Sequence, residues 1–231
     1  MIYFVSNFVR EGELMRNIYG LVLSIVYIGL VIGISGIFSK ASKEASRKFI
    51  HIMLSNWWII AMIFFDNVIV ASILPAVFIV INYVSYKYDI IKAMERDDGE
   101  EEQTLGTVFY AVSLLVVSII TFGFLKNPMI GLVGILVMGY GDGFAAIAGK
   151  SIKSKEFKVF GSKKSVAGCA TMFIISLIII SCALAYSNVS LWYVKSIVLA
   201  LIATVFEAIS IKGTDNLTVP ILTTLLFWMV L

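Results

Sequence analysis

The sequence has few of the residues that build the commonest metal and redox sites. Only two cysteines and one histidine occur among the 231 residues. Cys169 and Cys182 lie in one apolar run, about 20 Å apart along a helix, which is too far for a disulfide. His51 has no second histidine with which to form a transition-metal site. Zinc spacings, haem motifs, nucleophilic triads and nucleic-acid-binding modules are absent.

Two glycine-rich phosphate motifs are missing as well. The run 139–149 does not satisfy GxGxxG, and the run 161–165 lacks the GxxxxGK[ST] spacing.

Hydrophobic residues make up 60% of the chain, against about 45–50% in soluble domains. This composition indicates a polytopic membrane protein. The length suits one bundle over residues 1–231 and leaves no room for a separate soluble domain.

The sequence therefore predicts an all-α membrane bundle of about eight transmembrane helices. A span needs about 20 apolar residues. The candidate spans are 17–38, 50–65, 68–85, 105–124, 129–148, 166–186, 191–211 and 217–231. Residues 1–16 are a candidate interfacial segment.

The loop charges predict an orientation. Most of the 18 Lys and Arg residues follow the first, third, fifth and seventh spans, and only Arg10, Arg16, Lys126 and Lys195 fall elsewhere. Cytoplasmic loops carry such an excess of basic residues. We therefore expect an integral protein of the cytoplasmic membrane, with both termini outside and a site that faces the cytoplasm.

One carboxylate lies inside an apolar run. Asp142, within Gly139-Tyr140-Gly141-Asp142-Gly143, would cost roughly 2.5–3.5 kcal/mol in hydrocarbon, so it is a candidate site residue. Carboxylate oxygens suit Mg²⁺, which is held by one or two carboxylates together with substrate phosphates. The alternative is a small-residue packing patch in which the aspartate pairs with a lysine.

Basic residues lie at two further span ends. Arg47, Lys48 and His51 can share one helical face and hold a polyphosphate, or they anchor the helix at the membrane surface. The second group is Lys163, Lys164 and Ser165. Ser165 is a natural N-cap, and helix N-termini favour anions; the alternative is a capped helix after a basic loop.

Acidic residues recur near the end of the chain. Glu207 lies about one turn inside the seventh span, and Asp215 and Asn216 precede the eighth. These side chains could complete a metal–phosphate site with Asp142, although Asp215 could simply cap its helix. Thr107 adds a hydroxyl at the same predicted membrane face, so that distant parts of the chain converge there.

These motifs, in this order, resemble the polyprenol kinase family, which includes dolichol kinase, phytol kinase and CTP-dependent diacylglycerol kinase. The last motif is most similar to the phytol kinase branch. The matching stretches are Arg47 to His51, Leu105 to Tyr110, Gly141 to Lys150, Lys164 to Gly168, and Glu207 with Asp215 to Pro220.

The resemblance implies transfer of the γ-phosphoryl group of CTP to a membrane lipid alcohol, with Mg²⁺ or another divalent cation. The alcohol would be an isoprenoid such as dolichol, polyprenol or phytol, or else diacylglycerol. The expected catalytic residues are Asp142, Arg47, Lys48 and Lys164. The expected nucleotide-binding residues are His51, Thr107, Gly149, Lys150, Lys163, Ser165, Gly168 and Asn216. The expected metal ligands are Asp142, Glu207 and Asp215.

Two other functions stay open at this point. A cytidylyltransferase would make a CDP-lipid from a lipid phosphate, but the longer signature of phosphatidate cytidylyltransferases is absent. A small cation-coupled transporter would line a path through the bilayer, whereas the charged groups here gather on one predicted face. No nucleic acid partner is expected, and side-chain types do not distinguish the lipid alcohols or fix the oligomeric state.

Overall fold

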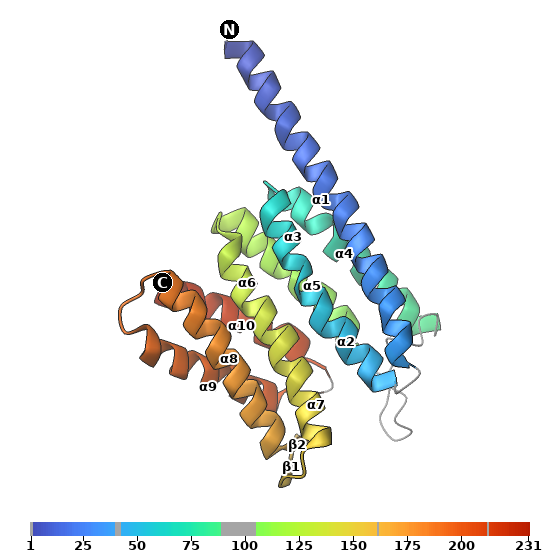
Figure 1. The fold of residues 1–231 in the computed structure, drawn as a ribbon, viewed down its shortest axis with the longest axis vertical. Coiled ribbons are helices and arrows are strands. Elements are labelled where there is room, and N and C mark those ends of the chain that lie inside the picture. Colours follow the sequence, from blue (N-terminus) through green and yellow to red (C-terminus); the bar gives the residue numbers. More distant parts are fainter. Residues whose placement is uncertain (1, 40–42, 89–104, 161, 212) are drawn as a thin grey trace.

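The computed structural model describes residues 2–39, 43–88, 105–160, 162–211 and 213–231. The described chain forms a helical bundle with one short β-hairpin at its end (Figure 1). Several residues used in the orientation argument or in a motif lie outside the described residues: Lys40, Gly161, Lys92, Arg96, Lys212 and the acidic stretch 95–102.

The helices follow one another along the chain with few interruptions. The elements are α1 (Ile2–Ser39), α2 (Lys43–Ser55), α3 (Trp57–Phe64), α4 (Val68–Tyr88), α5 (Gly106–Ser118), the π-helical segment η2 (Ile119–Phe124), α6 (Pro128–Leu136), the π-helical segment η3 (Val137–Asp142), α7 (Gly143–Ser151), β1 (Glu156–Val159), β2 (Ser162–Ser165), α8 (Val166–Tyr186), α9 (Trp192–Ile209) and α10 (Asp215–Val230).

Six helical segments of the described chain are long and apolar enough to cross a membrane, so the protein is an integral membrane protein. They are Glu11–Phe38, Val68–Tyr88, Gly106–Phe124, Pro128–Ser151, Val166–Tyr186 and Trp192–Ile209. Six of the eight predicted spans are thereby confirmed by length and composition.

The other two predicted spans are not long enough. The run 50–65 is divided at Asn56 between α2 and α3, and α2 begins earlier than predicted, in the charged sequence at Lys43. In the view of Figure 1, α3 continues in nearly the direction of α2. The last helix, α10, has 16 residues. The count of eight is therefore not confirmed.

The N-terminal segment is not a separate element. Residues 2–39 form one helix, and its first turns project beyond the rest of the bundle (Figure 1). No break divides the candidate interfacial segment 1–16 from the first span.

The all-α prediction missed the hairpin between α7 and α8. Strands β1 and β2 pair antiparallel, with Phe157 opposite Lys164 and Lys158 opposite Lys163. The signal for β1 is a short alternation of apolar and charged residues, in which Phe157 and Val159 alternate with Glu156 and Lys158. A run of four residues is too short to stand out between two long apolar runs.

Side-chain caps fix where two central helices begin. The Asn127 side chain accepts a hydrogen bond from the backbone N–H of Met129 at 3.2 Å, and Pro128 opens α6. The Ser165 hydroxyl oxygen accepts one from the backbone N–H of Gly168 at 3.1 Å. The prediction that Ser165 caps the sixth span is thus confirmed.

The centre of the bundle is built around α6, which packs against α10 on one side and meets α3 and α5 on others. Trp58, from α3, is fully buried there, and its indole N–H donates to the carbonyl of Pro128 at 2.9 Å. Gly131 is what lets this ring approach α6. A Cβ atom at that position would collide with the Trp58 ring and would lie 2.8 Å from Cγ1 of Val117.

Gly131→Ala should therefore destabilise the fold. Overpacking a well-filled core costs about 1–3 kcal/mol, or roughly 2–4 °C in Tm per kcal/mol for a chain of this size. Thermal unfolding in detergent measures the loss. Gly33→Ala is the matched control, since Gly33 lies exposed in α1 with open space around it; alanine there should stabilise the helix slightly. Equal losses in both variants would contradict the packing account.

Candidate active site

Asp142 ends the π-helical segment η3, which joins α6 to α7. The glycines around it are contact points with neighbouring helices. A Cβ atom would collide with Ser55 of α2 at Gly139, with Met172 of α8 at Gly141 and with Ile52 of α2 at Gly143. Small residues serve such close helix contacts in membranes. The three glycines therefore let α2 and α8 approach the turn that carries Asp142.

The approach of α2 brings a lysine to this carboxylate. The Lys48 ammonium donates a hydrogen bond to Oδ2 of Asp142 at 2.8 Å, and both side chains are almost fully buried. The Nε2 atom of His51 lies 3.3 Å from the same oxygen. That contact lacks hydrogen-bond geometry, so Nε2 has no hydrogen-bond partner among the described residues. The pairing of Asp142 with a lysine in a small-residue packing patch, given above as the alternative to a metal site, is present, and the lysine comes from α2.

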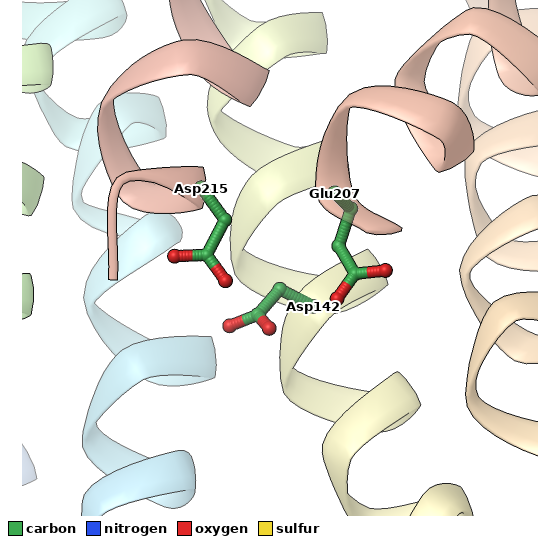
Figure 2. A group of neighbouring side chains, drawn as sticks. All are labelled: Asp142, Glu207 and Asp215. Atoms are coloured by element: carbon green, nitrogen blue, oxygen red, sulfur yellow. The ribbon is translucent and has the colours of Figure 1, made fainter. Parts of the chain in front are cut away.

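Two more carboxylates meet Asp142 from the other end of the sequence. Glu207 lies near the end of α9 and Asp215 at the start of α10, and the two point toward Asp142 (Figure 2). One oxygen from each of the three carboxylates lies within 4.8 Å of the others. We call these three residues the carboxylate cluster.

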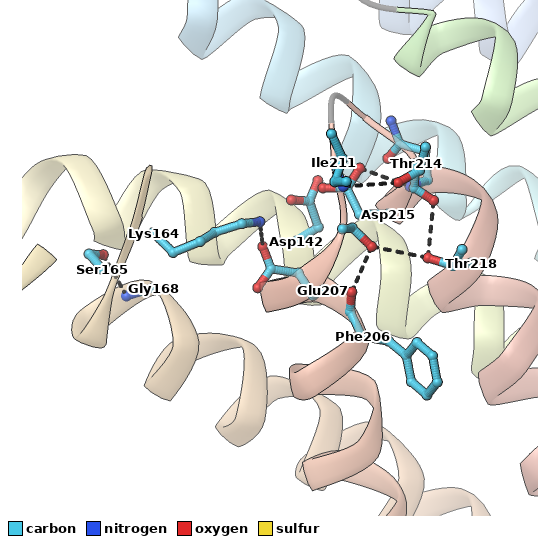
Figure 3. A network of polar contacts seen from close by, with 12 residues as sticks. Asp142, Lys164, Ser165, Gly168, Phe206, Glu207, Ile211, Thr214, Asp215 and Thr218 are labelled. Carbon is cyan, nitrogen blue, oxygen red and sulfur yellow. Dashed lines mark hydrogen bonds and ion pairs between the residues drawn. The ribbon is translucent and has the colours of Figure 1, made fainter. Parts of the chain in front are cut away.

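The turn between α9 and α10 is held by its own polar contacts (Figure 3). The Ser210 hydroxyl donates to the carbonyl of Phe206 at 2.6 Å and lies 3.2 Å from the Thr218 hydroxyl. The Thr214 hydroxyl accepts from the N–H of Ile211 at 3.0 Å. These bonds fix the start of α10 relative to the end of α9, and hence Asp215 relative to Glu207.

Asp215 is not the N-cap of α10. The N-cap position is Thr214, whose side chain makes no capping bond, and Asp215 accepts a hydrogen bond from the N–H of Asn216 at 3.0 Å. Because α10 starts at Asp215, Pro220 falls inside the helix.

The hairpin supplies the second lysine of the site. Lys164, on β2, forms an ion pair with Glu207 (Figure 3). Burial alone would lower the pKa of Lys164, but the carboxylates of Glu207 and Asp215 outweigh it and raise that pKa above its usual value. Lys164 therefore carries its positive charge throughout the physiological pH range, next to the carboxylate cluster.

A polar cavity borders the cluster on the α2 side. It is lined by Arg47, Ile50, His51, Leu54, Asn82, Thr107, Tyr110 and Asn216, and it encloses about 460 Å³, counting space open to the outside. Three predicted nucleotide-binding residues, His51, Thr107 and Asn216, thus share one cavity with Arg47. Sequence reasoning missed Asn82, since a single asparagine in an apolar run carries no spacing signal.

The other predicted nucleotide-binding residues lie around the hairpin and the contact of α7 with α8. A Cβ atom at Gly149 would lie 2.9 Å from the Ser165 hydroxyl, and one at Gly168 would lie 3.1 Å from the carbonyl of Ala145. Close helix packing therefore accounts for both glycines. Lys150 and Lys163 are exposed at the same end of the bundle, and the nucleotide-binding role of this group stays a prediction.

The donor set of the cluster fits a hard divalent cation. Three carboxylates offer only oxygen ligands, as Mg²⁺ prefers. Two buried or half-buried lysines neutralise two of the three negative charges, which leaves one negative charge for a cation to balance. Asp142, Glu207 and Asp215 are the residues that could hold it.

The charge balance makes a testable prediction about stability. Lys48→Met leaves three carboxylates with one lysine, and breaking a buried pair in this way costs about 3–5 kcal/mol. Asp142→Asn leaves two carboxylates with two lysines and should cost less. The double variant should regain part of the Lys48→Met loss, with a coupling of about 0.5–3 kcal/mol. Thermal unfolding in EDTA measures all three, and additive losses would contradict the pairing.

Comparison with known proteins finds relatives that are named phytol kinases. The chain is 30% identical over 228 residues to a protein named phytol kinase from Synechocystis sp., with 89% of each chain covered. It is 30% identical over 203 residues to a probable chloroplastic phytol kinase of Triticum aestivum and to phytol kinase 1 of Arabidopsis thaliana, covering 79% of this chain and 66% and 65% of theirs. No family model matches the chain, and no solved structure matches it.

The Synechocystis match covers nearly nine tenths of both chains. The chain belongs to the polyprenol and phytol kinase family.

Proposed function

We propose that this protein transfers the γ-phosphoryl group of a nucleoside triphosphate, CTP, to the hydroxyl of a membrane isoprenoid alcohol such as phytol. The observation that carries the proposal is the carboxylate cluster with its two lysines, buried at one end of an apolar bundle whose relatives are named phytol kinases. The products are the lipid phosphate and CDP.

In this proposal the acidic residues bind the cation and the basic residues bind the phosphates. Asp142, Glu207 and Asp215 would hold a divalent cation, Mg²⁺ in this proposal, which supplies charge neutralisation at the transferred phosphate when bound. Arg47, Lys48 and Lys164 hold phosphate oxygens, with Lys163 assisting from the hairpin. The remaining predicted residues of the hairpin and of α7 and α8 bind the rest of the nucleotide. Phosphoryl transfer depends chiefly on such positioning and electrostatic stabilisation.

The bond changes are simple. The alcohol oxygen forms a bond to the γ-phosphorus, and the bond from that phosphorus to the bridging oxygen of the β-phosphate breaks. The hydroxyl proton passes to a carboxylate of the cluster, and CDP leaves. Burial of the cluster excludes bulk water, which would otherwise compete with the alcohol as the nucleophile. We place the site on the cytoplasmic side on the basis of the loop charges.

Labelled CTP tests the reaction. Purified protein with Mg²⁺, phytol and γ-labelled CTP should give labelled lipid, whereas α-labelled CTP should give none. Asp142→Asn should lower the γ-label transfer by at least about 10³-fold, because the cluster loses a ligand and a proton acceptor. Uptake of a cation into proteoliposomes without nucleotide would instead support a transporter.

The matched control is Asp66→Asn. Asp66 is a half-buried carboxylate between α3 and α4. Its Oδ2 atom lies 3.8 Å from the Arg16 guanidinium, in a part of the chain that does not contribute to the cluster. This variant should retain activity within about twofold. Near-normal γ-label transfer in Asp142→Asn would refute the assigned role, and α label in the lipid would identify a cytidylyltransferase.

Cation binding can be measured without turnover. A ligand that binds only the folded state stabilises it by about 2.7 kcal/mol at 100 times its Kd. Saturating Mg²⁺ should therefore raise Tm by several degrees relative to EDTA. The shift should be lost in Glu207→Gln/Asp215→Asn and kept in Asp66→Asn. An equal shift in all three proteins would show that Mg²⁺ acts elsewhere.

A further inference from the structure

A second cavity adjoins the polar one. It is lined by Ile28, Leu54, Trp57, Leu74, Pro75, Phe78, Asn82, Tyr110, Ala111 and Leu114, and it encloses about 430 Å³, counting space open to the outside. It shares Leu54, Asn82 and Tyr110 with the polar cavity. Both are only partly enclosed. We call this second space the apolar cavity.

Two asparagines of the polar cavity have an oxygen without a partner. Nδ2 of Asn82 donates to the carbonyl of Thr107 at 3.0 Å, and Nδ2 of Asn216 donates to the carbonyl of Gly106 at 2.9 Å. A carbonyl can only accept, so these bonds fix which amide atom is nitrogen. Both Oδ1 atoms are buried and have no hydrogen-bond partner among the described residues. Buried acceptors of this kind are usually met by a donor, which an ordered water or a ligand can supply.

The two cavities together have a polar end near the carboxylate cluster and an apolar end away from it. The far wall of the polar cavity includes His51, whose Nε2 lies 3.3 Å from Asp142, and Asn216, which follows Asp215. Asn82 lies at the junction, and the other residues that line the apolar cavity are hydrophobic, with polar atoms only in the Tyr110 hydroxyl and the Trp57 indole N–H. A ligand that fits the pair therefore carries a hydrogen-bond donor at one end and a hydrocarbon chain behind it.

We propose that the two adjoining cavities form the lipid-alcohol site, with the hydroxyl in the polar cavity beside the carboxylate cluster and the first part of the isoprenoid chain in the apolar cavity. The Asn82 side chain accepts the O–H hydrogen bond through Oδ1 when the alcohol binds, and the hydroxyl turns toward the carboxylate cluster in the transfer step, where its proton leaves. The inference rests on the proposed function and deepens it, because it says which part of the alcohol the protein recognises. A nucleobase fits less well, since its polar edge groups would have few partners in the apolar cavity.

This arrangement assigns the two substrates to different sides of the cluster. It gives His51, Thr107 and Asn216 to the alcohol instead of the nucleotide, and Arg47 holds the phosphate from the alcohol side. The nucleotide lies toward the hairpin, where Lys163 and Lys164 are, and the alcohol lies between α4 and α5 on one side and α1, α2 and α3 on the other. The cavity holds only the part of the chain next to the hydroxyl, so the rest of a long isoprenoid extends into the membrane.

Asn82→Leu tests the hydrogen bond. Leucine has the same branching and the same number of heavy atoms as asparagine but cannot accept, so kcat/KM for phytol should fall about tenfold while KM for CTP stays within about twofold. Asn17→Leu is the matched control, because Asn17 is also a buried amide and accepts from the N–H of Asp66, far along α1 from the cavities. It should leave both constants unchanged. A rise in KM for CTP with an unchanged KM for phytol would overturn the assignment.

Ala111→Leu tests the hydrocarbon part. Ala111 is buried and lines only the apolar cavity of the two, so three added carbons should occupy space that the chain needs. Activity should fall at least tenfold with phytol and much less with a five-carbon prenyl alcohol. In a measurement without nucleotide, the Tm shift produced by phytol should also be lost. Ala183→Leu, a buried position of α8 away from both cavities, controls for overpacking.

The outcomes separate the two proposals. If the unmodified protein phosphorylates no lipid alcohol with any nucleotide, the proposed function fails. If it is active and Ala111→Leu leaves the ratio of phytol to prenyl alcohol activity unchanged, the function stands and the cavity assignment is wrong. If phytol shifts the Tm of the unmodified protein and of Ala111→Leu equally, the chain binds elsewhere, which also overturns the assignment.

Discussion

The structure depends on one buried ion pair, Asp142 with Lys48 at 2.8 Å. A carboxylate among apolar helices is costly unless a cation meets it, so α2 must approach the turn that carries Asp142. Gly139 and Gly143 make that approach sterically possible, because a side chain at either position would collide with α2. The ion pair needs α2 to lie close to this turn, and the glycines leave room for it. Together they fix the position of α2, which carries Lys48 and His51 into the site.

The same electrostatic reasoning explains why the end of the chain returns to this turn. Glu207 and Asp215 add two negative charges beside Asp142, and Lys164 neutralises only one of them. Burying three carboxylates together lowers the stability of the fold. Hydrogen bonds around Ser210 and Thr218 keep the cluster in place. A polar site that costs stability is expected where function requires it. In the proposed phosphoryl transfer, the cluster would bind a cation that accompanies the nucleotide.

Much of this site could be predicted from the sequence, and the reason is the cost of burial. Asp142 stands out because charges are rare in apolar runs, and Lys48, Glu207 and Asp215 stand out because they lie at the ends of such runs. Asn82 did not stand out, since a neutral amide is tolerated in a helix and its partner carbonyl lies 25 residues away. The hairpin that carries Lys164 was missed because four-residue strands have too weak a pattern. The break at Asn56 was missed because the apolar run continues through it.

The proposed division of the site into a nucleotide side and an alcohol side follows from the solubility of the two substrates. A polyphosphate must arrive from water, and the hairpin end with its exposed lysines provides a charged surface for it. An isoprenoid alcohol must arrive from the membrane, and an apolar cavity between helices allows this without exposing its chain to water. The carboxylate cluster lies where these two routes meet. A site deeper in the bundle would exclude the nucleotide, and one on the loops would strip the alcohol of its hydrocarbon surroundings. The position of Asp142, about two turns inside the end of its helix, satisfies both constraints.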